Sequence, residues 1–116
     1  MYYGDLVERD GLYYEKFSDV PYTGKVTGRQ KGHIKNGKRD GKYLAYRDNG
    51  QLWFKEFYKN GEREGESVCY YESGQLEKKG TYKNGLREGE WIYSDLDGNI
   101  NDELTGTYEN DKKISD

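Results

Sequence analysis

The sequence predicts an all-β protein, a single-layer, twisted antiparallel sheet of stacked β-hairpin repeats with an elongated shape. The first observation is a composition of 16 glycines and 13 tyrosines in 116 residues, since aromatic side chains suit a pleated, half-buried surface. The second is a set of short segments that recur at a fixed interval along the chain. The third is that glycine interrupts every stretch and no window keeps the 3.6-residue period of a helix.

The bulk properties limit the classes of function. A hydrophobic content of 32% predicts a thin structure, and a net charge of −3 gives no electrostatic support for nucleic-acid binding. The single cysteine allows no intramolecular disulfide, which favours a reducing compartment. No apolar run is long enough for a bilayer, and the first residues lack the pattern of a signal peptide. We therefore expect a cytoplasmic protein, or a secreted or surface one if a leader peptide was removed.

Recurring segments divide the chain into units. Glycine followed by a strand-like run occurs at Gly41, Gly65 and Gly89, which are evenly spaced. The third copy slips, because Tyr108 lies two positions beyond the place that this interval predicts from Tyr82, and we expect the extra residues near Asn101-Asp102. The predicted division is an N-terminal cap with a partial repeat, three repeats, and a C-terminal cap on the last: 1–40, 41–64, 65–88 and 89–116.

The residues between the strands predict the turns. We expect a three-residue loop at Asp48-Asn49-Gly50, with glycine in the left-handed conformation and a bulge, because a two-residue loop would scatter the repeated apolar positions over both faces. This loop places Tyr46 opposite Leu52 and Leu44 opposite Phe54. The same reasoning predicts a three-residue loop at Lys59-Asn60-Gly61. One face then collects Leu44, Tyr46, Leu52, Phe54 and Tyr58 with their equivalents.

The opposite face is the candidate protein-binding surface. A single-layer sheet cannot bury both faces, and tyrosine and tryptophan are enriched at the centres of protein interfaces. The alternative is that these aromatic columns only hold the sheet together. The candidate residues are Tyr43, Trp53, Phe57, Trp91 and Tyr93.

A basic stretch near the N-terminal end is a second candidate site. Between residues 25 and 39 there are basic residues and no acidic ones. The plainer interpretation is a solvated face, and the sharper one is a patch for an anionic partner. Its residues are Lys25, Arg29, Lys31, Lys35, Lys38 and Arg39.

Catalytic and metal chemistry find little support, so we predict no enzyme activity, no catalytic or metal residues and no cofactor. One histidine, His33, and one cysteine, Cys69, cannot complete a zinc site without unusual carboxylate help. Asp40, Glu64 and Glu88 form a ladder with members roughly 10 Å apart, near the spacing of inverting glycosidases. Each of them follows an arginine and precedes a glycine, so turn chemistry with a local charge partner is the better account.

Two segments resemble the core of the MORN repeat. Residues 57–66 and 81–90 both carry an aromatic residue, a Lys-Asn-Gly turn, a basic residue and a further glycine. The period and the Asn-Gly-Gln-Leu half of each unit look most like the bacterial variant found in the YwqK-type antitoxin family, and residues 11–26 are similar to its opening segment. The chain departs from the pattern at Ser67, where an aromatic is usual, at Ser94, and at Asp111, which replaces the turn glycine.

The resemblance implies a repeat sheet that contacts another protein, in its most specific form an antitoxin or immunity protein that neutralises a cognate toxin. The alternative functions are a scaffold that associates with membrane lipid and a sheet that assembles through its edges. We expect no nucleic-acid partner, and a monomer or a weak homo-oligomer.

Overall fold

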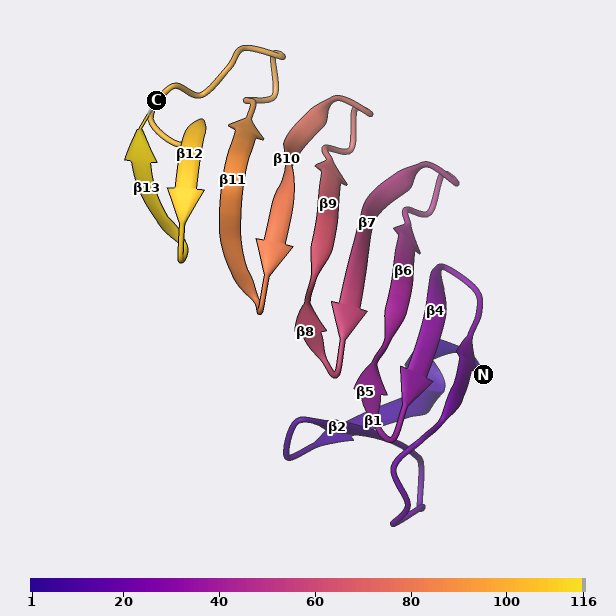
Figure 1. The fold of residues 1–116 in the computed structure, drawn as a ribbon. Helices are drawn as coiled ribbons and strands as arrows, with labels where there is room; N and C mark the ends of the chain where they lie inside the picture. The colour runs from indigo at the N-terminus through magenta and orange to yellow at the C-terminus, as the bar shows by residue number, and fades with distance from the viewer. Residues whose placement is uncertain (116) are drawn as a thin grey trace.

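The computed structural model describes residues 1–115 and contains, apart from one 3₁₀ turn at Tyr3–Asp5, only strands and loops. The predicted all-β fold with a single-layer antiparallel sheet is confirmed (Figure 1). The strands in chain order are β1 (Leu6–Arg9), β2 (Leu12–Glu15), β3 (Gly24–Val26), β4 (Gln30–Lys35), β5 (Lys38–Arg39), β6 (Gly41–Tyr46), β7 (Leu52–Lys59), β8 (Glu62–Arg63), β9 (Gly65–Tyr70), β10 (Leu76–Lys83), β11 (Leu86–Tyr93), β12 (Gly106–Glu109) and β13 (Lys112–Ser115).

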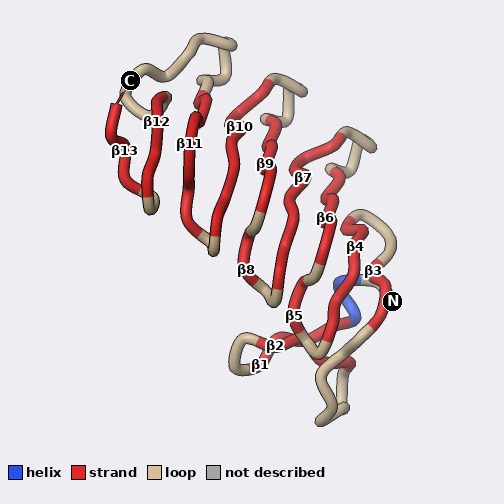
Figure 2. The backbone as a smooth tube through the Cα atoms, viewed as in Figure 1, coloured by secondary structure: helices blue, strands red, loops and turns tan. Residues whose placement is uncertain are grey.

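The large sheet runs β13-β12-β11-β10-β9-β7-β6-β4-β3, and the short strands β5 and β8 pair with β4 and β7. Each strand pairs mainly with its neighbours along the chain, so the hairpins stand side by side in an open row (Figure 2). The molecule measures 48 × 33 × 18 Å, as expected for an elongated stack of repeats.

The predicted three-residue loop at Asp48-Asn49-Gly50 is confirmed. The Arg47 amide donates to the Gln51 carbonyl at 2.8 Å, and Gly50 has the left-handed φ of +87°. Tyr46 pairs with Leu52 as expected. Hydrogen bonds at the same positions close the corresponding loops of the next two units, between Tyr71 and Gln75 and between Asp95 and Asn99.

The register beyond this loop differs from the prediction. A bulge after Leu52 pairs Ala45 with Phe54, so Leu44 lies opposite Lys55 rather than opposite Phe54. Because one extra residue moves every later side chain to the other face, Phe54 shares a face with Ala45, and Phe57 lies on the opposite face. The predicted division of the two faces is therefore wrong after the bulge. A second bulge, between Leu76 and Lys78, repeats this in the next unit.

The strand pairings assign each side chain to one of the two faces of the sheet. We call the first the ladder face, and it carries Tyr43, Ala45, Phe54, Glu56, Tyr58, Ser67, Cys69, Tyr82, Trp91 and Tyr93. The lysine face carries a row in which lysine alternates with an aliphatic residue, namely Lys31, Leu44, Lys55, Val68, Lys79 and Ile92.

The turns at the other ends of the hairpins have two loop residues, not three. Lys59 pairs with Glu62, and the loop residues Asn60 and Gly61 have φ values of +51° and +84°. Two positive φ angles in succession define a type I′ turn, whose twist matches that of the flanking strands. The prediction of a three-residue loop here is wrong. The same turn recurs at 36–37, 84–85 and 110–111.

The third unit has an additional turn after Ile100. Residues 101–105 form a turn in which the Asn101 side-chain oxygen accepts hydrogen bonds from the Glu103 and Leu104 amides, at 3.0 and 3.1 Å. The turn follows the bridge between Ser94 and Ile100. It occupies the place of the bulges in the two preceding units.

A central row of the ladder face explains how so thin a sheet is packed. Tyr43 and Trp91 are fully buried, and each ring lies directly over a glycine. A Cβ atom at Gly32 would come within 2.3 Å of the Tyr43 ring, and one at Gly80 within 2.1 Å of the Trp91 ring. The row runs across the sheet as Gly32, Tyr43, Glu56, Ser67, Gly80, Trp91 and Gly106.

Ser67, which departs from the aromatic usual at its position, belongs to this row. Its neighbour Glu56 takes the place that Gly32 holds in the unit before and Gly80 in the unit after. The Ser67 hydroxyl donates to the Glu56 carboxylate at 3.0 Å. A small polar residue beside a buried carboxylate thus replaces an aromatic ring over a glycine.

Residues 6–15 form the hairpin β1–β2, which crosses the end of the large sheet near β4 and β5 (Figure 1). Leu6 packs with Val26 and Ile34 in the buried cluster between the hairpin and the sheet. The chain start also covers the edge strand β3, because the Thr27 amide donates to the Met1 carbonyl at 2.8 Å. At the other end of the sheet β13 is the edge strand.

Candidate protein-binding surface

The five predicted aromatic residues do not form one accessible face. Tyr43 and Trp91 are 0% exposed, so the expectation that they are available to a partner is wrong. They are core residues because the glycines beneath them let the rings lie flat on the backbone. Phe57 is half-buried on the lysine face, since the bulge in β7 reverses its direction. Trp53 and Tyr93 remain accessible on the ladder face.

Trp53 is the most exposed aromatic residue of the ladder face outside the N-terminal hairpin, with 41% of its surface accessible. The bulge keeps it on the same side as Phe54, and their rings meet edge to face with centroids 5.5 Å apart. The Arg47 guanidinium lies 4.9 Å from the Trp53 ring centre. Cation–π contact and ring packing therefore hold an exposed tryptophan in one orientation.

Phe54 and Tyr82 belong to this surface, although the sequence predicted them on the face of Leu44 and its equivalents. Both are half-buried on the ladder face. Strict alternation of side chains along β7 and β10 would place both residues on the lysine face. The bulges after Leu52 and Leu76 turn them to the ladder face. The adjacent aromatic residues Trp53 and Phe54 were the signal in the sequence, because two neighbours in a strand share a face only at such an irregularity.

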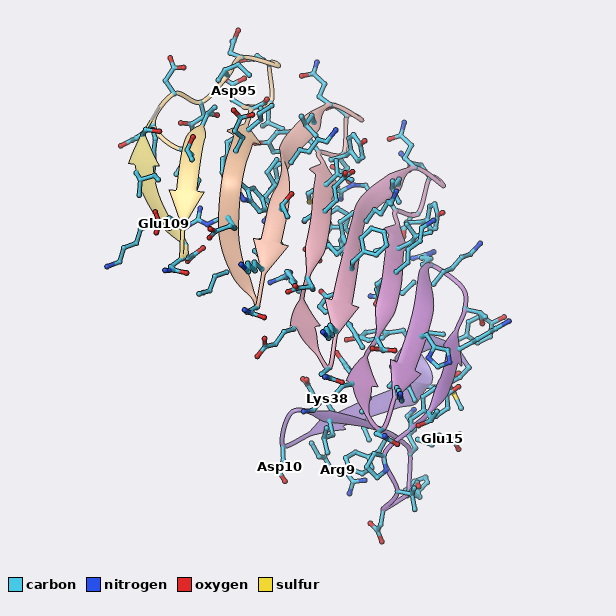
Figure 3. All side chains as sticks on the ribbon, viewed as in Figure 1. Arg9, Asp10, Glu15, Lys38, Asp95 and Glu109 are labelled. Atoms are coloured by element: carbon cyan, nitrogen blue, oxygen red, sulfur yellow. The ribbon has the colours of Figure 1, made fainter. Side chains whose placement is uncertain are left out.

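Two hollows lie on the ladder face between the N-terminal hairpin and the middle of the sheet. The larger has a volume of about 550 Å³ and is bounded by Glu8, Gly11 and Tyr13 of the hairpin. Lys38 stands beside this hairpin (Figure 3). The smaller, about 310 Å³, is lined by Trp53 and Phe54. Both hollows share the residues Arg39, Tyr58 and Arg63.

An arginine column runs across this surface, with Arg39, Arg63 and Arg87 at the same position of three successive units. Each guanidinium lies over a tyrosine ring of the ladder face. The distances to the ring centres are 4.5 Å from Arg39 to Tyr43, 5.4 Å from Arg63 to Tyr82 and 4.3 Å from Arg87 to Tyr108. Burial raises the pKa of Tyr43 to about 12, so its hydroxyl stays protonated near neutral pH.

Arg63 and Arg87 each have a carboxylate partner. The Arg63 Nε donates to Glu56 at 2.7 Å, and the Arg87 Nε donates to Asp111 at 2.6 Å. The hydrogen bond from Arg87 holds the pKa of Asp111 below its usual value. Asp111, which replaces a turn glycine, is thus the partner of the last arginine in the column.

The basic stretch is divided between two faces. Lys25, Lys31 and Lys35 are exposed on the lysine face. Arg29 forms an ion pair with Asp48. Arg39 lies on the ladder face among tyrosine rings, so its inclusion in a single patch with the lysines is wrong. The role of the remaining basic residues stays a prediction.

Two of the three regularly spaced acidic residues accept hydrogen bonds from backbone amides of the turns. Glu64 accepts a hydrogen bond from the Asn84 amide at 2.6 Å, and Glu88 accepts one from the Asn110 amide at 3.0 Å. The expected turn chemistry is confirmed for these two. The expected partnership with the preceding arginine is wrong, because Arg63 and Arg87 pair with other carboxylates.

Other reactive side chains are separated. His33 is exposed on the lysine face, whereas Cys69 is half-buried on the ladder face, where burial raises the pKa of its thiol. Among residues 1–115 no group of three histidine, cysteine or acidic side chains is placed to hold a metal ion. The same residues contain no helix long and apolar enough to cross a bilayer.

The comparison with known proteins supports the repeat assignment. No curated protein matches the chain. Residues 39–60 and 63–84 match the family model of the MORN repeat variant, and these ranges contain the hairpins β6–β7 and β9–β10. Two adjacent segments in the middle of this chain are therefore similar to the MORN repeat of the variant type.

Proposed function

We propose that this chain is a non-catalytic protein-binding module, and that the partner docks on the part of the ladder face beyond the N-terminal hairpin. The observation that carries the proposal is the 41% exposure of Trp53 beside a hollow. Aromatic anchors next to pockets dominate the binding energy of protein interfaces. The MORN match supports the proposal, since the resemblance implies a sheet used for protein contacts.

The arrangement around Trp53 favours a protein partner over a small substrate. The ring is held by Phe54 and Arg47, so little conformational entropy is lost when it is covered. The hollow beside it is lined by charged and aromatic groups together, including Glu77 and Lys78. This mixture of an aromatic centre and a charged rim is typical of protein interfaces.

The most specific version of this proposal is an antitoxin or immunity protein, as the resemblance to the YwqK-type family implies. We expect Trp53→Ala to weaken capture of the partner from a lysate of the source organism about 30-fold, or about 2 kcal/mol, because an anchor residue is lost. The measurement is capture at physiological salt with mass spectrometry. A captured toxin would stop growth when expressed alone and would be neutralised when expressed together with this chain.

A matched control is available on the other face. Ile92 has the same 41% exposure as Trp53 but belongs to the lysine face. Ile92→Ala should leave capture unchanged, with both variants folded by circular dichroism. Equal losses for the two variants, or capture that survives Trp53→Ala, would contradict the placement of the binding surface.

The lysine face supports a second candidate function, association with an anionic membrane surface. Lys31, Lys55 and Lys79 alternate with aliphatic residues in one row across the sheet. Each lysine near an anionic bilayer contributes about 1 kcal/mol. This row combines the charge and the apolar surface that such binding uses.

The membrane candidate predicts salt-sensitive flotation with vesicles that contain phosphatidylserine. We expect Lys31→Gln combined with Lys79→Gln to reduce binding about 30-fold, from two contributions of about 1 kcal/mol. Lys78→Gln, on the ladder face, is the control. Absence of flotation at low salt, or flotation that the double substitution does not reduce, would rule this candidate out.

A further inference from the structure

The three arginines of the column differ in whether a carboxylate of this chain pairs with them. In each unit two positions can supply a carboxylate to the arginine, one on the neighbouring strand and one in the turn of the next hairpin. For Arg63 these positions hold Glu56 and Gly85, and Glu56 forms the ion pair. For Arg87 they hold Gly80 and Asp111, and Asp111 forms the ion pair.

Arg39 has a glycine at both positions, Gly32 and Gly61. No carboxylate of residues 1–115 lies within ion-pairing distance of Arg39. Its Nε is buried and has no hydrogen-bond partner, whereas the Nε of each other arginine in the column donates to a carboxylate. The Nη1 atom of its guanidinium donates to the Tyr58 hydroxyl at 3.2 Å, which is a neutral acceptor.

This environment is costly for a free cation. The guanidinium is surrounded by the rings of Tyr3, Tyr13, Tyr43 and Tyr58, which lie 4.5 to 5.7 Å from it. Cation–π contacts offset part of the lost hydration, but a buried charge is fully compensated only by an opposite charge with good hydrogen-bond geometry. The free protein does not provide that charge among its described residues.

We propose that Arg39 receives an aspartate or glutamate side chain of the protein partner, which enters the 550 Å³ hollow beside hairpin β1–β2. This inference rests on the proposed protein-binding function and names the partner group that the site takes. The hollow has Arg39 in its lining and is large enough for a short loop. Tyr13 and Tyr58 line it, so the aliphatic stem of an acidic side chain has apolar surface to pack against.

The charges around the hollow favour a single carboxylate over a phosphate group. Glu8 and Glu62 stand at its wall and repel a group with two negative charges more strongly. Arg63 lines the same hollow but is already neutralised by Glu56. Lys38 and Arg39 are the two cations of this lining that have no ion pair among the described residues. Of these two, Arg39 has the planar, bidentate donors that suit a carboxylate.

The test uses nuclear magnetic resonance of the whole chain, with the Nε–Hε signals of the three column arginines as reporters. The probe is a blocked pentapeptide Gly-Ser-Glu-Ser-Gly, and the matched control is the same peptide with glutamine. We expect saturable shifts of the Arg39 signal with the glutamate peptide only. The signals of Arg63 and Arg87 should stay in place because their Nε groups are already bonded.

Thermal unfolding of two variants separates a binding role from a structural one. Arg39→Met should keep or raise the melting temperature, because it removes an uncompensated cation. The same substitution should lower the affinity for the glutamate peptide at least tenfold. Arg63→Met should lower the melting temperature, because Glu56 is left buried without its partner.

Three results would overturn the proposal. The first is an equal shift of the Nε–Hε signals of all three arginines with the glutamate peptide. The second is a shift of the Arg39 signal with inorganic phosphate but not with the glutamate peptide. The third is a loss of melting temperature in Arg39→Met as large as that in Arg63→Met, which would make Arg39 a structural residue. Capture of a partner that depends on Trp53 would stand in each case, so this test and that of the proposed function fail separately.

Discussion

Gly80→Ala is expected to destabilise the protein by about 3 kcal/mol, a large effect for the addition of one methyl group. The new Cβ would lie 2.1 Å from Cδ2 of Trp91, a ring that is fully buried and cannot move aside without losing its packing. The backbone conformation at Gly80 is ordinary, so the effect is steric and not one of backbone strain. Urea unfolding followed by tryptophan fluorescence measures it.

Two controls test the cause. Gly4→Ala should be nearly neutral, because beyond Gly4 and its two chain neighbours no heavy atom of the described residues lies within 4 Å of the new Cβ. In the background of Trp91→Ala, the further change Gly80→Ala should lose most of its effect, because the ring that it meets is gone. If Gly80→Ala destabilises equally with and without Trp91, the ring-over-glycine contact is not the cause.

Glu56→Ala should destabilise the protein by about 3 kcal/mol, because removal of this buried carboxylate leaves the buried hydroxyls of Ser67 and Tyr58 without their acceptor and the half-exposed Arg63 without its ion-pair partner. Glu56 is 6% exposed. Its carboxylate accepts hydrogen bonds from Arg63 at 2.7 Å, from Ser67 at 3.0 Å and from Tyr58 at 3.1 Å. Chemical unfolding of the variant measures the change in free energy.

Glu62→Ala is the matched control for Glu56→Ala, since Glu62 is exposed on β8, the strand paired with β7, and its replacement should be nearly neutral. A stronger test rebuilds the packing of the neighbouring units. Glu56→Gly together with Ser67→Tyr places a ring over a glycine, as at Tyr43 and Trp91, and should be less destabilised than Glu56→Gly alone. A double variant no more stable than the single one would show that the two arrangements are not equivalent.

The features that the sequence alone determined are the local ones. The regular repeat and the Asn-Gly turns specify hairpins, because positive φ angles are tolerated at few residue types and the hydrogen bonds of a turn are made within it. For the same reason the loop at Asp48-Asn49-Gly50 was predictable. The fold class followed from these turns together with an aromatic-rich, helix-free composition.

The tertiary structure decided which side chains face which way. The bulges after Leu52 and Leu76 reverse the faces within a strand, and a bulge is selected by packing against neighbouring strands, not by the residues at the bulge alone. The candidate site depended on such non-local contacts. Tyr43 and Trp91 are core residues because glycines from other strands lie beneath them. Arg39 lies apart from Lys31 and Lys35 because the pairing of β4 with β5 turns it to the ladder face, where Tyr3 and Tyr13 contact it. Sequence spacing specifies turns through local backbone conformation, whereas burial is a property of strands that meet only in the folded sheet.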